Sequence, residues 1–186
     1  MIDLSCHFST PIWSQILTLD NKSLANHVLS LEAKGGVDKS NKGGFQSNNL
    51  DLSTPAMQDF INAISPSVKA VVDSLKVNTP QEFRFLNMWA NINRRWNYNS
   101  RHSHPSALLS GVYYVAAPQD CGNIVFFRSD GLLETTDLTF GNEIFSAGVE
   151  VPAKEGLLVL FPAWVPHEVK QSHTDEPRIS ISFNIG

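Results

Sequence analysis

Residues 178–184 read Arg-Ile-Ser-Ile-Ser-Phe-Asn, and polar and apolar side chains alternate strictly along them. Successive side chains of an extended strand point to opposite faces, so the isoleucines share one face with Phe183. Arg178, Ser180 and Ser182 share the other face. The apolar face predicts a strand packed on a core. The polar face sets a guanidinium two residues from a hydroxyl, which suits a carboxylate ligand, although an ordinary solvated face is the alternative.

Five more short runs rich in β-branched and aromatic residues precede this strand. They cover residues 83–93, 107–116, 124–128, 156–161 and 167–171, and Pro, Gly, Asn and Asp punctuate them. Short strands at this spacing are typical of a sandwich or a barrel rather than of βαβ units.

The part of the chain before residue 80 has a different pattern, which favours helices. After Asp20 apolar residues recur at helical spacing until the glycines at 35 and 36. A second helix is expected to start at Thr54, because threonine is a good N-cap and proline at position 55 suits the first helical position. At Pro66 this helix either kinks or gives way to a third.

Length and composition limit the class of protein. The chain has 186 residues, of which 42% are hydrophobic and 17% are charged. These values exclude intrinsic disorder and a coiled coil, and the net charge of −4 argues against wrapping of nucleic acid. We therefore expect one domain over residues 1–186. In it, helices and loops of residues 1–80 support a jelly-roll-like β core of residues 81–186.

Cysteine usage and the N-terminal sequence indicate where the protein works. The two cysteines, Cys6 and Cys121, cannot form a disulfide framework and suit a reducing compartment. A signal peptide requires basic residues near the N-terminus, but the first lysine or arginine is Lys22. No apolar run is long enough for a membrane span. We expect a soluble cytoplasmic protein without a membrane partner.

Residues 34–49 separate the two expected helices and contain four glycines and three lysines. A flexible surface loop is one interpretation of this stretch. A mobile lid is the other, because loops of this length in compact domains are often functional. The Phe45-Gln46 pair favours a docking element that faces inwards.

The histidines of the second half carry the clearest chemical signal. His102 and His104 are two residues apart, so on an extended strand both rings face the same side and can bind one divalent metal. The third ligand must come from elsewhere, and His167 is a candidate because it follows an apolar strand and a proline-rich turn. Alternatively, His167 only closes that turn.

Four of the six arginines fall between residues 84 and 101, together with Trp89, Trp96 and Tyr98. Basic residues interleaved with aromatic ones can bind single-stranded nucleic acid. We favour a simpler interpretation, in which a strand leads into a loop with exposed arginines. On that interpretation Trp96, Tyr98 and Trp164 are candidates for a substrate rim.

Six motifs occur in a fixed order along the chain: residues 43–47 (Gly-Gly-Phe-Gln-Ser), 102–105 (His-Ser-His-Pro), 110–115 (Ser-Gly-Val-Tyr-Tyr-Val), 156–162 (Gly-Leu-Leu-Val-Leu-Phe-Pro), His167, and 178–184. In this combination they resemble the core of an Fe(II)- and 2-oxoglutarate-dependent dioxygenase, in particular the oxygenases found in bacteria and marine phages. The resemblance implies a double-stranded β-helix, a variant of the jelly roll, with the metal near its open mouth. It also implies Fe(II), 2-oxoglutarate and O2 as cofactor and cosubstrates.

The resemblance assigns roles to residues of this chain. It implies three metal ligands, which are also the catalytic residues: His102, His104 and His167. It implies that 2-oxoglutarate is bound by residues of several strands: Arg178, Ser180, Tyr114, Asn91 and Ser110. The implied activity is hydroxylation of a C–H bond with release of succinate and CO2.

The chain departs from the wider superfamily at the second metal ligand, where His104 replaces the usual aspartate or glutamate. Three imidazoles can hold Fe(II), or only His102 and His167 bind and water or chloride takes the third position.

Two other functions share the expected barrel. A cupin would use a similar metal site without 2-oxoglutarate, although Trp164 stands where the second cupin motif has glycine and the expected glutamate is missing after the His-x-His. A non-catalytic jelly roll would need no histidine cluster. The substrate, a small molecule or a residue of a protein, cannot be read from the sequence, and nucleic acid is a disfavoured partner.

Overall fold

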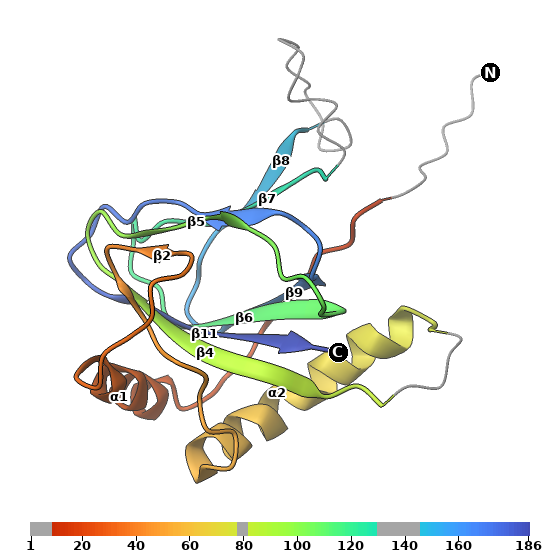
Figure 1. The fold of residues 1–186 in the computed structure, drawn as a ribbon, viewed down its shortest axis with the longest axis horizontal. Helices are drawn as coiled ribbons and strands as arrows, with labels where there is room; N and C mark the ends of the chain where they lie inside the picture. The colour runs from red at the N-terminus through yellow and green to blue at the C-terminus, as the bar shows by residue number, and fades with distance from the viewer. Residues whose placement is uncertain (1–8, 78–81, 130–145) are drawn as a thin grey trace.

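The computed structural model describes residues 9–77, 82–129 and 146–186. Two antiparallel sheets lie face to face, and both helices pack on the outer face of the larger sheet (Figure 1). The elements in chain order are β1 (Trp13–Ile16), α1 (Asn21–Glu32), β2 (Asn41–Lys42), β3 (Phe45–Gln46), α2 (Pro55–Ser74), β4 (Phe85–Asn93), β5 (Tyr98–His102), β6 (Leu109–Ala116), β7 (Ile124–Phe127), β8 (Gly148–Val151), β9 (Leu157–Pro162), β10 (His167–Val169) and β11 (Arg178–Ile185).

The two sheets form a jelly roll, as the sequence predicts. The larger sheet has the order β1-β9-β6-β11-β4-β3, and the smaller has the order β2-β5-β10-β7-β8. Many neighbours in the two sheets are distant in the sequence, as in the pairing of β11 with both β4 and β6. The strand order therefore brings chain segments from both halves of the protein to the space between the sheets.

Strand β11 separates two environments. Ile179, Ile181 and Phe183 are buried in the cluster that joins the larger sheet to the helices. The side chains of Arg178 and Ser180 point the other way and line a cavity between the sheets. The predicted alternation is confirmed, and the apolar face packs against the helices rather than inside the barrel.

Both predicted helices are present. The side chain of Asp20 caps α1 by accepting a hydrogen bond of 3.0 Å from the backbone N–H of Ser23. Helix α2 continues through Pro66, so no third helix begins there. Buried residues on one side of α2, among them Phe60 and Ile64, contribute to the helix–sheet core.

The first 80 residues contain three short strands where only helices and loops were expected, β1, β2 and β3. Strand β1 lies at one edge of the larger sheet against β9, and β3 lies at the other edge against β4. Strand β2 pairs with β5 in the smaller sheet. A strand of two to four residues is too short to show a periodic pattern in the sequence. Its extended conformation is therefore determined by the strand with which it pairs. Strands β5 and β8 were missed for a similar reason.

The pairing of β2 and β3 also changes the interpretation of residues 34–49. Phe45 and Gln46 are only 8% and 5% exposed, and Phe45 belongs to the helix–sheet core. The segment is thus anchored to both sheets at its centre and is not a free surface loop. That it moves as a lid stays a prediction. Cys6, used above to infer the compartment, lies outside the described residues, and Cys121 is buried and free.

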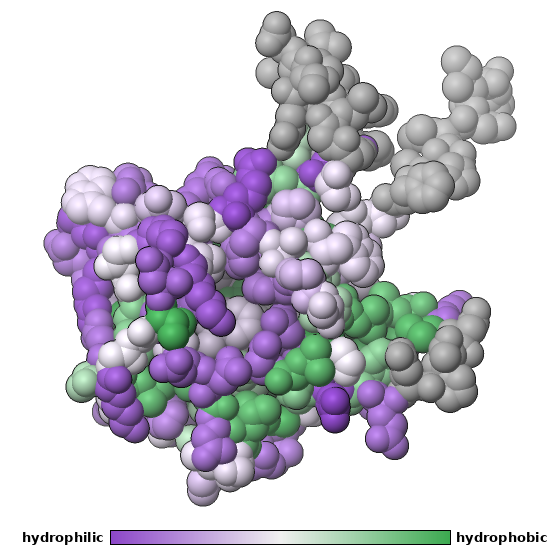
Figure 2. Space-filling model, in the orientation of Figure 1, coloured by the Kyte–Doolittle hydropathy of each residue, from purple (hydrophilic) through white to green (hydrophobic). Residues whose placement is uncertain are grey.

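Surface polarity differs between the two ends of the face shown in Figure 2. Hydrophobic residues gather over α2 and the adjacent end of β4, whereas the side over β2 and β5 is mainly hydrophilic. Within the described residues, neither helix combines the length and hydropathy needed to cross a membrane.

We predict that Ile181→Ala strongly destabilises the fold, because Ile181 is fully buried in the helix–sheet core. Removal of a buried isoleucine side chain typically costs about 2–5 kcal/mol. The same substitution at Ile16, which is 57% exposed, is the matched control and should change stability by less than about 0.5 kcal/mol. Urea unfolding of both variants measures the difference, and equal losses would contradict this description of the core.

Candidate active site

Three histidines meet where β5 and β10 pair. His102 ends β5 and lies directly opposite His167, the first residue of β10. His104 follows β5, and its backbone N–H donates to the carbonyl of Ala163 at 2.8 Å. The ring centroids are 4.4 Å apart for His102 and His167, 4.9 Å for His102 and His104, and 5.1 Å for His104 and His167. The potential ligand atoms of the three rings all lie within 4.8 Å of one another.

Backbone carbonyls fix the orientation of two of these rings. The Nδ1 atom of His102 lies 2.7 Å from the carbonyl oxygen of Ser100, and that of His167 lies 2.9 Å from the carbonyl oxygen of Val165. A carbonyl oxygen can only accept, so each Nδ1 carries the proton and each Nε2 keeps its lone pair. This is the tautomer that a metal site bound through Nε2 requires.

Burial keeps the three imidazoles neutral. Desolvation lowers the pKa of His167 to about 3 and that of His104 to about 4, and it also lowers the pKa of His102. Proximity to His102 adds to the effect on the other two rings. At neutral pH the rings therefore present lone pairs rather than charges, as metal ligands must. The group of potential metal ligands found among the described residues consists of these three histidines and includes no carboxylate.

An inner cavity between the sheets adjoins the histidines and contains the guanidinium of Arg178. This side chain is 2% exposed, and burial lowers its pKa. It donates to the carbonyl oxygens of Cys121 and Gly122 (3.0 Å for Gly122), and its other nitrogen lies 3.5 Å from Oδ1 of Asn99. None of the ion pairs among the described residues involves Arg178. A buried charge without a counter-charge is costly, so the cavity favours an anionic ligand.

The hydroxyl of Tyr114 lies in the same cavity without a hydrogen-bond partner among the described residues. It is buried beside Arg178 and makes no hydrogen bond to any described residue. Burial raises the pKa of Tyr114 to about 12, so the group stays protonated and can donate. A carboxylate bound by Arg178 would fill this place, and the residues present therefore fit 2-oxoglutarate.

Most of the predicted cosubstrate residues surround this inner cavity. Ser180 of β11 lies opposite Asn91 of β4 and Tyr114 of β6, which brings the three side chains together. Ser110 does not join them, because its hydroxyl donates to Oδ1 of Asn184 at 2.7 Å, near the opposite end of β11. The inner cavity is lined by the three histidines and by Asn91, Asn99, Tyr114, Arg178, Ser180 and Ser182, among others. Sequence reasoning missed Asn99, and it placed Ser182 on the correct face without a role.

A wider outer pocket of about 750 Å³ adjoins the inner cavity. It shares Ser40, Trp89, His102 and His104 with the inner cavity, whereas His167 lines the inner cavity alone, so the two spaces adjoin at His102 and His104. The ring of Trp89 packs against His104 with a centroid distance of 5.5 Å. Five carboxamide side chains line this pocket. Gln46 belongs to the Phe45-Gln46 pair that the sequence singled out, whereas Asn48, Asn49, Asn87 and Asn184 were not singled out. Trp96, Tyr98 and Trp164, the residues expected at a substrate rim, are not among the residues that line the pocket.

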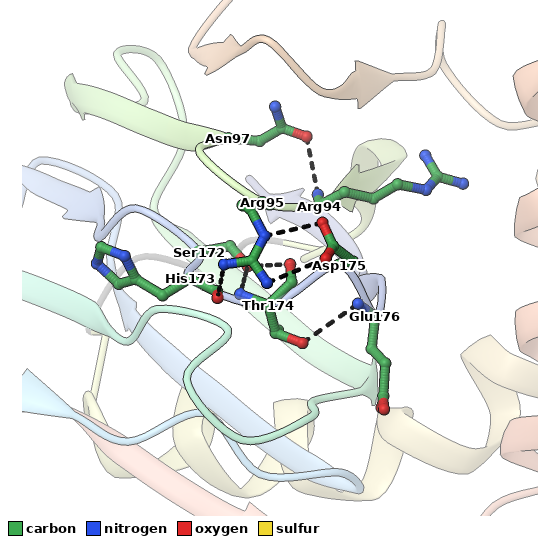
Figure 3. Close-up of polar contacts among 8 residues, drawn as sticks. All are labelled: Arg94, Arg95, Asn97, Ser172, His173, Thr174, Asp175 and Glu176. Atoms are coloured by element: carbon green, nitrogen blue, oxygen red, sulfur yellow. Dashed lines mark hydrogen bonds and ion pairs between the residues drawn. The ribbon is translucent and has the colours of Figure 1, made fainter.

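Three of the four arginines between residues 84 and 101 are paired with acidic side chains of the fold. Arg94 makes a bidentate ion pair with Glu32, and Nε of Arg101 lies 3.5 Å from a carboxylate oxygen of Glu168. Figure 3 shows two nitrogens of Arg95 donating to the carboxylate of Asp175, while the third nitrogen donates to the carbonyl oxygen of His173. These charges are neutralised within the fold, which supports the simpler interpretation over binding of single-stranded nucleic acid.

Comparison with known proteins gives the family. The family model described as "Putative 2OG-Fe(II) oxygenase" matches residues 87–184, which is more than half of the chain. The protein belongs to this 2-oxoglutarate- and Fe(II)-dependent oxygenase family. The matched region runs from β4 to β11 and includes all three histidines, Tyr114 and Arg178. Membership favours an oxygenase over a cupin and over a non-catalytic jelly roll.

Solved structures of several other proteins share the fold of this oxygenase. A prolyl-4-hydroxylase from Pseudomonas putida superposes with a TM-score of 0.66 at 18% identity, covering 95% of this chain and 92% of that one. The α-ketoglutarate-dependent epimerase SnoN from nogalamycin biosynthesis gives a TM-score of 0.68 at 19% identity, covering 94% and 75%. HygX from Streptomyces hygroscopicus, solved with nickel and 2-oxoglutarate, gives 0.65 at 12% identity, covering 95% and 83%. No curated protein matches the sequence significantly.

We predict that metal binding depends on the residue at position 104. His104→Ala should weaken binding of Mn(II) by more than the 10–100-fold that loss of a supporting hydrogen bond typically costs, because a ligand atom is removed. His104→Asp should retain binding, because a carboxylate oxygen then takes the place it has in the wider superfamily. Isothermal titration calorimetry measures both.

His173→Ala is the control for this experiment, because His173 is exposed and packs against Trp96, outside the cluster. It should bind Mn(II) like the wild type. Wild-type affinity in His104→Ala would instead favour a site made by His102 and His167 alone, with water or chloride in the third position.

Proposed function

We propose that the protein hydroxylates an unactivated C–H bond of a substrate held in the outer pocket. In this reaction 2-oxoglutarate and O2 are converted to succinate and CO2; one oxygen atom enters the substrate and the other enters the new carboxylate of succinate. The observation that carries the proposal is a cluster of three neutral imidazoles at a donor-lined inner cavity, two of which, His102 and His104, also line an open outer pocket.

The Nε2 atoms of His102 and His167, together with His104, would hold Fe(II). When bound, the iron supplies the activation of O2 that no side chain can provide. The chain itself orients the rings through the carbonyls of Ser100 and Val165. The aromatic rings of Trp89 and Phe161 pack against His104 and His167, which limits the access of water to the ligands.

The inner cavity would bind 2-oxoglutarate through the carboxylate farthest from the metal. Arg178 offers a charged fork, Tyr114 offers a hydroxyl without another partner, and Ser180 offers a second hydroxyl. Asn91 would contribute a further hydrogen bond from β4. We do not extend this role to Ser110, whose hydroxyl is used by Asn184.

The substrate is a small molecule or a residue of a protein chain, and the carboxamides of the outer pocket would contact it. We place the reaction in the cytoplasm, because the buried thiol of Cys121 is free and a reducing compartment preserves both thiols and Fe(II).

We predict that anaerobic addition of Fe(II) and 2-oxoglutarate produces the weak visible charge-transfer band of the metal chelate. The band requires both the metal ligands and the cosubstrate site, so it tests the two halves of the proposal together. Its absence at saturating Fe(II) would contradict the proposed function.

We further predict that Arg178→Lys lowers affinity for 2-oxoglutarate roughly tenfold to a hundredfold, because lysine keeps the charge but cannot make bidentate hydrogen bonds to a carboxylate. Metal binding should persist. Arg95→Lys is the matched control, because Arg95 pairs with Asp175 away from both cavities, and it should leave affinity unchanged.

Uncoupled succinate formation at limiting 2-oxoglutarate provides the kinetic version of this test. Arg178→Ala, saturated with iron, should be much slower than the wild type. Equal rates would mean that Arg178 is a structural residue and would remove the main support for a 2-oxoglutarate site.

A further inference from the structure

Asn41 connects the β2–β3 segment to the inner cavity through a chain of hydrogen bonds. It is 4% exposed and does not line the inner cavity itself. Its side-chain nitrogen lies 2.9 Å from the carbonyl oxygen of Phe45, 3.3 Å from Oδ1 of Asn91 and 3.2 Å from Oδ1 of Asn93. Its own Oδ1 accepts from the side-chain nitrogen of Asn93 at 3.2 Å. All of its polar atoms are used inside the protein.

The carbonyl of Phe45 sets the direction of this chain. A backbone carbonyl can only accept, so the NH2 group of Asn41 must face it. The same NH2 group also faces the Oδ1 atoms of Asn91 and Asn93, so its two N–H bonds are shared among three acceptors, and the contact to Asn91 is the longest. An NH2 group of Asn91 turned towards Asn41 would instead face another donor, which disfavours that orientation. The NH2 group of Asn91 is left to point away from Asn41, and it lies 3.5 Å from Oγ of Ser182, another residue of the inner cavity.

We propose that Asn41 is a positioning residue, which holds Asn91 with its donor side towards 2-oxoglutarate. The inference rests on the proposed function. Arg178, Tyr114 and Asn91 then all present donors to the same cavity, as an anion requires. With its amide reversed, Asn91 would present an oxygen to the oxygens of the cosubstrate and repel them.

The turn between β2 and β3 is shaped around this amide. A Cβ atom on Gly44 would lie 2.6 Å from Oδ1 of Asn41 and 2.5 Å from the carbonyl oxygen of Ile92. The turn can therefore cover Asn41 this closely only with glycine at position 44. The β2–β3 segment thus acts on the cosubstrate site from a distance.

The test is Asn41→Asp, which replaces the NH2 group by an acceptor of the same size. Asn91 must then turn its own NH2 group towards the new carboxylate and expose its oxygen to the cavity. We expect affinity of the Mn(II)-loaded protein for 2-oxoglutarate to fall roughly tenfold to a hundredfold, measured by calorimetry, with unchanged affinity for Mn(II). Asn97→Asp is the matched control, because Oδ1 of Asn97 accepts from the backbone of Arg94 and Asn97 lines neither cavity; it should not change affinity.

A double-mutant cycle separates positioning from a general structural role. If Asn41 acts through Asn91, adding Asn41→Asp to Asn91→Ala should change affinity by less than about twofold. The same loss in both backgrounds, or no loss in the wild-type background, would overturn the inference. If thermal unfolding shows that Asn41→Asp does not fold, Asn41→Ser takes its place in the cycle. We expect Asn41→Ser to lower affinity for 2-oxoglutarate several-fold in the wild-type background and to have no effect when combined with Asn91→Ala.

The cycle also distinguishes this inference from the function on which it rests. If the Mn(II)-loaded wild type does not bind 2-oxoglutarate, the proposed function fails and the inference fails with it. If the wild type binds and the two substitutions act independently, only the positioning role of Asn41 is overturned.

Discussion

The central position of β11 in the larger sheet constrains the rest of the molecule. Because β11 pairs with β4 on one side and β6 on the other, its alternate residues must point either to the helices or to the space between the sheets. Ile181 and its apolar neighbours point to the helices and pack the two helices on the sheet. Arg178 and Ser180 are thereby carried into the barrel, where a shift of one residue would bury isoleucines instead.

Electrostatics inside the barrel follow from the same arrangement. The three histidines are neutral, and the one buried formal charge among the described residues that line the inner cavity is that of Arg178. With His104 in place of an acid, a bound divalent metal would keep its full charge rather than share it with a carboxylate. Both ends of the inner cavity would then attract the dianion 2-oxoglutarate. A metal site of three histidines would thus favour an acidic cosubstrate.

The parts that sequence reasoning predicted correctly have strong local signals. The Asp20 cap and the apolar spacing after it gave α1, and the alternation of residues 178–184 gave β11. The short strands of residues 41–46 have no such signal, because two residues cannot show a period. Their conformation comes from pairing with β5 and β4, which begin more than 35 residues later. The orientation of Asn91 depends on this pairing and could not be inferred from its own neighbours.

The sequence by itself determined the jelly-roll class, the helical start of the chain, the His102 and His104 pair, and the polar face that bears Arg178. These features depend on local spacing: alternation within strands, apolar periodicity within helices, and two histidines two residues apart. Only the tertiary structure decided that His167 lies opposite His102, that Tyr114 lacks a partner, and that Ser110 serves Asn184 instead of the inner cavity. Each of these facts arises from contact between residues far apart in the chain, and such contacts are set by strand register and by the burial of polar groups.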